Sequence, residues 1–427
     1  MISRILTFFL TFQFTFQGFS QNKEYVRGII DTLSSPSFYG RGYVNLGDSI
    51  TSEFIRSEYE QIGLLPYNES YFQVFNHNVN TLPGIVRLEF DDVQLKPGIE
   101  FLADPASGSG KGKVQVEEIE LKDIFGTEWI EKVKKGKVIS IDLTQSDSLN
   151  NREKEKVMEF IQYMKFEENI QAKALIIYQK GKQPWYVSNK QGFRSIFTVF
   201  KDSIDQKPEK VRFTTEAEYL KNYRSRNVIG YIPGTENPDT ILVVSAHYDH
   251  LGMMGSQALF PGANDNASGV AMMLDMAKYF QAHPPKHTVY FIAFAGEEAG
   301  LVGSGYFVQN PVFSLPKVKV LVNLDLAGTG VDGITVVNGK IFEDEFNTLR
   351  SINEQKNYLK KVTARGDACN SDHCPFFQNG VKSFFIYTLG GTTYYHDIFD
   401  SPQTLKLNEY NNYFLLIRDF LDGIDRQ

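Results

Sequence analysis

The chain has 427 residues, of which 42% are hydrophobic and 22% are charged. This composition is close to that of soluble globular proteins and excludes a disordered, fibrous or polytopic membrane chain, and the length predicts two or three domains. The 44 basic and 51 acidic residues give a net charge of −7, which excludes a basic surface field that would attract nucleic acid or anionic lipid.

The N-terminus has the charged, apolar and small-residue order of a secretory signal. A basic residue precedes the apolar run ILTFFLTFQFTFQ, and Gly18-Phe19-Ser20 closes it before the polar letters QNKE. As a membrane span this run is short and is interrupted by Gln13 and Gln17. We therefore expect a signal peptide over residues 1–20, a secreted or periplasmic protein, and no stable membrane insertion after cleavage. An uncleaved anchor and a buried amphipathic helix are the alternatives.

Residues 21–84 are predicted to be an N-terminal segment that packs on a larger body. Its clearest element is a helix over 47–66, which ends at the stop signals Gly63 and Pro66. Apolar residues recur at helical spacing at Ile50, Phe54, Ile55, Tyr59 and Ile62.

Residues 85–218 differ in composition from the preceding segment and predict a separate, smaller mixed β/α domain. Short β-type runs occupy 84–90, 137–142 and 174–178, and a charged, helix-like stretch covers 151–171. The Gly/Lys cluster at 107–113 lacks the Gly-Lys-Ser/Thr ending of a phosphate loop. We expect this cluster to be a flexible loop.

Residues 219–427 show the strand-then-helix alternation of an α/β domain. Continuous apolar runs at 240–246, 288–294, 318–324 and 381–387 are typical of parallel strands that are covered on both faces. The predicted fold class is therefore α/β, with a central mixed, largely parallel sheet flanked by helices.

Potential metal ligands follow each of these predicted strands. The first strand ends at His247, the second leads to Glu297 and Glu298, and the third leads to Asp325. The fourth leads through a glycine-rich loop to His396, and Asp265 lies between the first strand and its helix. Ligands of open α/β sheets bind outside the carboxyl ends of the strands, so these side chains are expected to converge.

Five of these side chains, the two histidines with Asp265, Glu298 and Asp325, suit a pair of metal ions. Three carboxylates crowded together repel unless cations lie among them, and five ligands exceed the needs of one catalytic zinc ion. Two dications against three carboxylates leave one positive charge, which a hydroxide neutralises. We expect two zinc ions, with iron and manganese as alternatives. Each position taken alone could be a structural histidine or a helix cap without any function in metal binding. The occurrence of all five at the ends of predicted strands or before a helix of one sheet argues against that interpretation.

The other histidines and the two cysteines do not share this pattern. His77, His283 and His287 are not grouped with other potential metal ligands after a predicted strand, so we expect them at the surface. Cys369 and Cys374 are too few for a disulfide framework, and their pairing in an exported protein stays open.

The ordered motifs between about 230 and 405 resemble the co-catalytic zinc aminopeptidases, the secreted bacterial leucyl type that is distantly related to glutamate carboxypeptidase and the transferrin receptor. The matching stretches are AHYDH at 246–250, GANDNASG at 262–269, GEEAGLVGS at 296–304, NLD at 323–325, SDH at 371–373, and Tyr395-His396 followed by Asp400-Ser401. The region 85–218 resembles a protease-associated domain inserted into the zinc exopeptidase fold.

The resemblance implies a role for each metal ligand. Asp265 would bridge two zinc ions, with His247 and Asp325 completing one site and Glu298 and His396 the other.

The resemblance also implies roles for residues beside the ligands. Glu297 would be the general base, and Tyr395 would hydrogen-bond the tetrahedral intermediate. Asp249 and Asp400 would be partners of the histidine ligands, and the role of His373 stays open.

The implied activity is that of a secreted metallo-aminopeptidase. It would hydrolyse the N-terminal peptide bond of peptides with a free N-terminus, through a zinc-bound hydroxide and with Glu297 as base. The alternatives are glutaminyl-peptide cyclisation, carboxypeptidase action, and a non-catalytic receptor-like ectodomain. Side-chain preference and oligomeric state stay open. An aromatic substrate pocket is one interpretation of Phe384, Phe385, Tyr387, Tyr394 and Tyr395, and core packing is favoured for the first two.

Overall fold

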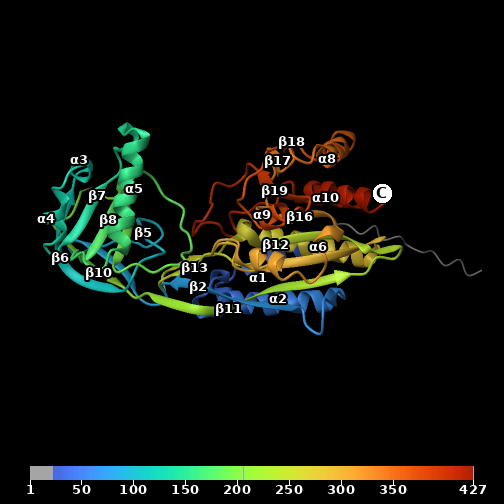
Figure 1. The fold of residues 1–427 in the computed structure, drawn as a ribbon, viewed down its shortest axis with the longest axis horizontal. Helices are drawn as coiled ribbons and strands as arrows, with labels where there is room; N and C mark the ends of the chain where they lie inside the picture. Colours follow the sequence, from blue (N-terminus) through green and yellow to red (C-terminus); the bar gives the residue numbers. More distant parts are fainter. Residues whose placement is uncertain (1–22, 205, 427) are drawn as a thin grey trace, which may run out of the picture.

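The computed structural model describes residues 23–204 and 206–426 and contains two separate large sheets (Figure 1). The nine-stranded sheet and its helices form one body, and the eight-stranded sheet with helix α5 stands apart at the other end of the molecule. The predicted signal segment, residues 1–20, lies outside the described residues. Among the helices that are described, none combines the length and apolar character that a membrane span needs.

The nine-stranded sheet is mixed and has four parallel strands at its centre. Its order is β1-β11-β15-β12-β16-β19-β17-β18, with β2 also paired to β11. The parallel strands are β15 (His287–Phe294), β12 (Asn237–His247), β16 (Val318–Leu324) and β19 (Ser383–Leu389). They confirm the four predicted apolar strands and the predicted α/β fold class.

Antiparallel strands adjoin the parallel centre of this sheet on both sides. Antiparallel pairing joins β11 to β15 and β17 to β19. The bounds are β1 (Leu65–Pro66), β2 (Phe72–Thr81), β11 (Glu218–Ile232), β17 (Gly333–Val337) and β18 (Val362–Ala364).

Helices cover both faces of the sheet and bury its apolar side chains. One face packs against α1 (Lys23–Leu33), α2 (Gly47–Ile62), α6 (Gly269–Ala282) and α10 (Tyr410–Asp425) in the largest core cluster. The other face packs against α7 (Val302–Gln309) and α9 (His373–Gln378). The remaining helix of this body, α8 (Glu343–Lys356), contacts α10. Burial on both faces explains why the central strands are continuous apolar runs.

The N-terminal segment packs on this body. Helix α2 confirms the predicted helix, and it ends before Gly63, whose φ of 90° places it in the left-handed conformation that closes helices. The buried side chains of Ile55 and Tyr59 join the core formed by α6 and the sheet.

The eight-stranded sheet is made of strands between Val86 and Thr215, in the order β4-β3-β10-β6-β7-β8-β9-β5. Its elements are β3 (Val86–Phe90), β4 (Val93–Gln94), β5 (Phe101–Ala103), β6 (Gly110–Ile119), α3 (Leu121–Ile124), α4 (Trp129–Val133), β7 (Val138–Asp142), α5 (Asn151–Phe166), β8 (Ala174–Gln179), β9 (Ser195–Phe200) and β10 (Lys210–Thr215). The paired strands β2 and β11 lead the chain into and out of this domain.

Two local expectations were wrong. The cluster 107–113 is not wholly a loop, because β6 begins at Gly110 and pairs with β10, so its lysines alternate along a half-exposed strand. His287 is buried instead of exposed, and its Nδ1 lies 2.9 Å from Asp425 Oδ1. A single acidic partner on a distant helix, which the sequence does not reveal, makes that burial favourable.

Candidate metal centre

The central strands bring the predicted ligands to one edge of the sheet. His247 is the last residue of β12, Glu297 and Glu298 follow β15, and Asp325 directly follows β16. The order β15-β12-β16-β19 makes these strands neighbours, and their parallel direction aligns their carboxyl ends. His396 arrives on the loop after β19.

Asp265 lies between the two predicted histidine ligands. His247 Nε2 is 3.4 Å from Asp265 Oδ1 and 3.4 Å from Asp325 Oδ1. On the other side, His396 Nε2 is 3.1 Å from Asp265 Oδ2 and 3.2 Å from Glu298 Oε2. The structure therefore brings all five predicted ligands together, and the two oxygens of one carboxylate face two different imidazoles.

The short segment that carries Asp265 precedes helix α6. Residues Ala263–Ser268 form one irregular turn, in which Asn266 Nδ2 donates to the Leu324 carbonyl and Ser268 Oγ donates to the Asn264 carbonyl. The first bond ties the turn to the end of β16, where Asp325 follows, and the second closes the turn on itself. The end of β16 therefore positions both Asp265 and Asp325.

The chemistry of these side chains fits divalent cations. Asp265, Glu298 and Asp325 have almost fully buried carboxylates, and each has an oxygen 3.1 to 3.4 Å from the Nε2 atom of a predicted histidine ligand. Asp325 Oδ1 is buried and has no hydrogen-bond partner among the described residues. Its close contact is the ion pair with His247 Nε2 at 3.4 Å. Buried carboxylates are costly unless they are paired or bind metal, so an oxygen that has no hydrogen bond and faces a predicted histidine ligand is a natural metal ligand. Oxygen and imidazole nitrogen donors suit zinc.

The carboxylates create a field that stabilises positive charge. Burial lowers the pKa of His396, but the charges of Glu298 and Asp265 outweigh it and raise that pKa to about 11. At His247 burial is likewise outweighed, mainly by Asp325 and Glu297, and the pKa rises well above its usual value. Cations placed among these carboxylates would meet the same favourable field.

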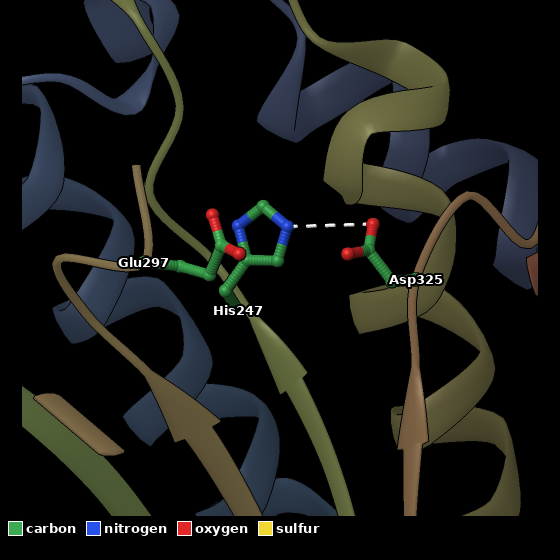
Figure 2. Close-up of side chains that lie close together, drawn as sticks. All are labelled: His247, Glu297 and Asp325. Carbon is green, nitrogen blue, oxygen red and sulfur yellow. Dashed lines mark ion pairs between the residues drawn. The ribbon is translucent and has the colours of Figure 1, made fainter. Parts of the chain in front are cut away.

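Glu297 lies beside this cluster, on the opposite side of His247 from Asp325 (Figure 2). Ligand atoms of these three side chains all lie within 4.8 Å of one another. Burial raises the pKa of Glu297 well above its usual value, and the charges of Glu298, Asp372 and Asp325 raise it further. A carboxyl group with a raised pKa is suited to accept and return a proton near neutral pH.

Asp249 supports the segment that carries both glutamates. Its carboxylate accepts hydrogen bonds from the main-chain N–H groups of Glu297 and Glu298, at 3.1 and 3.3 Å. The imidazole Nδ1 of His247 lies closer to the main-chain carbonyl of Asp249, at 3.1 Å, than to its carboxylate, at 3.9 Å. Asp249 therefore orients His247 through its backbone.

Asp400 does not take the position that the resemblance implied. Its carboxylate accepts hydrogen bonds from the main-chain N–H groups of Asn264 and Asp265, at 2.9 to 3.1 Å. The imidazole Nδ1 of His396 instead lies 2.7 Å from the main-chain carbonyl of Trp185, in the other domain. Asp400 thus holds the segment of the central carboxylate, because the turn after His396 directs it toward that segment.

The aromatic residues near the site divide into exposed and buried sets. Tyr395 is 50% exposed, and its ring stacks on the imidazole of His396 with centroids 3.9 Å apart. Tyr394 is also exposed, whereas Phe384 and Phe385 are buried in the core. Core packing is therefore their role.

The SDH motif and the cysteines lie beside the cluster. Ser371 Oγ donates to Asp325 Oδ2 at 3.0 Å, so the motif positions a predicted ligand. His373 is buried, and burial lowers its pKa to about 4, which keeps it neutral. Cys369 and Cys374 form a disulfide with a Cα–Cα distance of 5.0 Å across this segment.

Sequence reasoning missed two supports and left a third residue outside the ligand set. His250 is buried, and its Nδ1 lies 2.9 Å from Glu298 Oε1, where it supports a predicted ligand. Its position three residues after His247 was the available signal. Arg41 donates to the main-chain carbonyls of Gly262 and Asp265, and Trp185 contacts His396. Neither residue carries a motif signal, because these contacts join distant parts of the chain.

The fold and the cluster together define an α/β domain with a buried histidine and carboxylate centre at the ends of its parallel strands. Residues 227–421 match the model of Peptidase family M28.

Two curated relatives are similar in sequence. Aminopeptidase YwaD of Bacillus subtilis (strain 168) is 30% identical over 224 residues, which are 50% of this chain and 47% of that protein. A probable zinc metalloprotease of Pyricularia oryzae is 40% identical over 105 residues, 24% of this chain and 21% of that protein. The chain thus spans about half or less of the curated relatives it matches.

Two solved structures share the fold over most of the chain. A zinc aminopeptidase from Bacillus subtilis superposes with a TM-score of 0.69 at 21% identity and covers 94% of both chains. An aminopeptidase from Aneurinibacillus sp. strain AM-1 has a TM-score of 0.62 at 19% identity, with 94% of this chain and 93% of that chain covered. Both the sheet body and the second domain fall within this coverage.

Proposed function

We propose that the protein is an exported zinc aminopeptidase that uses two zinc ions. One observation carries the proposal: the two oxygens of Asp265 face the Nε2 atoms of His247 and His396, at 3.4 and 3.1 Å. Asp265 would be shared by both ions, Asp325 would complete the ligands on the His247 side, and Glu298 would complete them on the His396 side. The match of residues 227–421 to Peptidase family M28 and the relatives' names support zinc and peptide hydrolysis.

Proton transfer and stabilisation of the transition-state charge would be carried out by different residues of the protein. Zinc, when bound, supplies Lewis acidity that polarises a carbonyl and lowers the pKa of water to roughly 7. Glu297 would accept the proton of the attacking water at its carboxylate and deliver it to the departing amine nitrogen. This step contributes about 10²–10⁴-fold in such enzymes.

Tyr395 would stabilise the oxyanion of the tetrahedral intermediate. Desolvation and the charges of Asp265, Glu298 and Asp325 raise the pKa of its phenol, so the phenol keeps its proton and can donate it in a hydrogen bond. The donor belongs to an exposed ring that stacks on a predicted ligand, where it remains accessible to substrate.

The alternatives are weaker on specific grounds. A receptor-like ectodomain needs no hydrolytic centre, whereas all five predicted ligands and Glu297 are clustered in this chain. A carboxypeptidase needs a cation for the substrate carboxylate. Arg41 cannot serve, because its five N–H groups all bond main-chain carbonyls. A cyclotransferase with a single zinc ion would need only one of the two histidines that face Asp265, so it does not explain why both are present.

Export is part of the proposal. The signal-like N-terminus motivates it, and the Cys369–Cys374 disulfide is consistent with an oxidising compartment. Immunodetection of the protein in the medium or periplasm, together with the N-terminal sequence of the mature chain, tests this part.

The activity is tested with purified protein of known metal content. Chelator-treated and zinc-reloaded samples are compared on aminoacyl amides, the same peptides with a blocked amine, and peptides with N-terminal glutamine. We expect zinc-dependent release of the N-terminal residue from the free amine substrates only. Equal cleavage of blocked peptides, or cyclisation without hydrolysis, would refute the aminopeptidase assignment.

A further inference from the structure

The loop between β8 and β9 of the inserted domain reaches the predicted ligand His396. The main-chain carbonyl of Trp185 lies 2.7 Å from His396 Nδ1, and the main-chain N–H of Trp185 donates to the His396 carbonyl at 3.1 Å. Two residues separated by more than 200 positions in sequence are thus joined by a reciprocal pair of hydrogen bonds.

This contact fixes which imidazole nitrogen is free. A carbonyl only accepts, so Nδ1 of His396 carries the proton and donates it to Trp185. The other nitrogen, Nε2, faces Asp265 and Glu298 at 3.1 and 3.2 Å, and it is the atom that would give its lone pair to a metal ion once the ion displaces its proton. Partners of this kind orient metal-binding histidines and set their tautomer.

Trp185 is anchored to both domains. Its indole Nε1 donates to the Ala103 carbonyl of β5 at 2.7 Å, and the ring is only 5% exposed. The same ring stacks on Phe260 of β14 (Ala258–Phe260), with centroids 4.7 Å apart and planes at 19°. Phe260 shortly precedes the turn that carries Asp265. The indole therefore holds its own carbonyl at a defined position relative to the cluster.

A second contact from the same loop clamps the segment after His396. Lys182 Nζ lies 2.6 Å from Asp397 Oδ1 and 4.4 Å from the ring centroid of Phe399. His396 itself has a φ of 54°, a left-handed conformation that costs a non-glycine residue free energy. The contacts of Trp185 with His396 and of Lys182 with Asp397 hold that conformation.

We propose that Trp185 is a positioning residue of the metal centre, so that the inserted domain completes the ligand set by holding His396 in the tautomer and orientation that bind zinc. The inference deepens the proposed function and depends on it, because it assigns the second domain a part in zinc binding at the His396 side.

Zinc affinity is the first test, measured on the full chain by competition with a chromophoric chelator. Trp185→Ala is expected to weaken one of the two zinc-binding steps by about 10–100-fold and to leave the other nearly unchanged. Trp185→Phe keeps the stack on Phe260 and is expected to recover part of that affinity. Trp129→Ala is the matched control.

The control is well matched because Trp129 and Trp185 are the two tryptophans of the chain. Trp129 lies on α4 of the same domain and packs on Phe160 and Tyr163, with ring centroids 5.1 and 5.8 Å away. Its loss perturbs the inserted domain without touching His396, so both zinc steps are expected to match the wild type. Equal losses in both alanine variants would overturn the proposal, as would unchanged zinc binding in folded Trp185→Ala.

Fluorescence gives a second readout that does not require the alanine variant to fold. In Trp129→Phe the emission comes from Trp185 alone, and zinc titration is expected to change it. In Trp185→Phe the emission of Trp129 is expected to stay constant. No zinc response from Trp185, while two zinc ions bind, would overturn this inference alone. A wild-type chain that takes up no zinc would overturn the proposed function and this inference with it.

Discussion

Arg41 offers the sharpest test of how the site is held, because its side chain is fully buried and all of its donors are used. It donates to the main-chain carbonyls of Tyr248, Leu33, Pro261, Gly262 and Asp265, at distances from 2.6 to 3.1 Å. Three of these carbonyls belong to the segment 261–265, which ends in the central carboxylate. Arg41→Met keeps the aliphatic stem and removes every one of these bonds.

The size of the effect follows from the number of acceptors. At a low estimate of roughly 1 kcal/mol for each buried carbonyl left unpaired, five acceptors cost about 5 kcal/mol. Burial of the guanidinium, which lowers its pKa to about 10, offsets part of this cost. We expect Arg41→Met to reduce the free energy of unfolding by about 3–5 kcal/mol. Lysine has three donors, so Arg41→Lys should leave two carbonyls unpaired and cost about 2 kcal/mol.

The assay is urea unfolding followed by circular dichroism, with chelator present so that metal binding does not contribute. Arg27 provides a matched control, because it donates to the carbonyls of Pro402 and Leu405 in a partly exposed position. Arg27→Met is expected to cost less than about 1 kcal/mol. A cost below 1 kcal/mol for Arg41→Met, or an equal cost for methionine and lysine, would refute the reasoning.

Three further predictions address the base, the buried charges and the substrate. Glu297→Gln should keep two zinc ions by metal analysis and lose at least about 10²-fold in kcat; an active variant would refute the base assignment. Asp275 has a pKa raised to about 6 by burial, so the folded state binds a proton more tightly than the unfolded state and stability falls as the pH rises from about 4 to 6. In urea unfolding, Asp275→Asn should therefore raise the free energy of unfolding by up to about 3 kcal/mol at pH 8 and leave it unchanged at pH 4. An effect that does not depend on pH would contradict this. Tyr186 is 49% exposed with its ring 5.0 Å from that of His396, so Tyr186→Ala should lower kcat/KM about tenfold for large apolar N-terminal residues and little for alanine; a uniform loss would argue against a substrate contact.

The sequence revealed the fold of the sheet body and the members of the cluster for one physical reason. Parallel strands that are covered on both faces are continuous apolar runs, and the residue after each run lies at the same edge. His247, Glu298 and Asp325 were therefore predictable from position alone, and their chemistry pointed to metal. Asp265 precedes a helix and cannot be distinguished from a helix cap by itself. It was identified because the other potential ligands follow the neighbouring strands.

The residues that support the cluster were hidden because their contacts are made between distant segments. Arg41 reaches the turn at 261–265 from the N-terminal segment, and Trp185 reaches His396 from another domain. Periodicity reports which face of an element is buried, and it does not report which carbonyl a side chain meets. The same limit explains Asp400, whose partner depends on the path of a turn that has no periodicity.

The most direct test of the account is to locate zinc by anomalous X-ray scattering in crystals of the full chain loaded with zinc. The account predicts two peaks beside the ends of β12 and β16, one on each side of the Asp265 carboxylate, and the loss of at least one peak in Asp265→Ala. A single peak, peaks away from His247 and His396, or two peaks that persist in Asp265→Ala would contradict it.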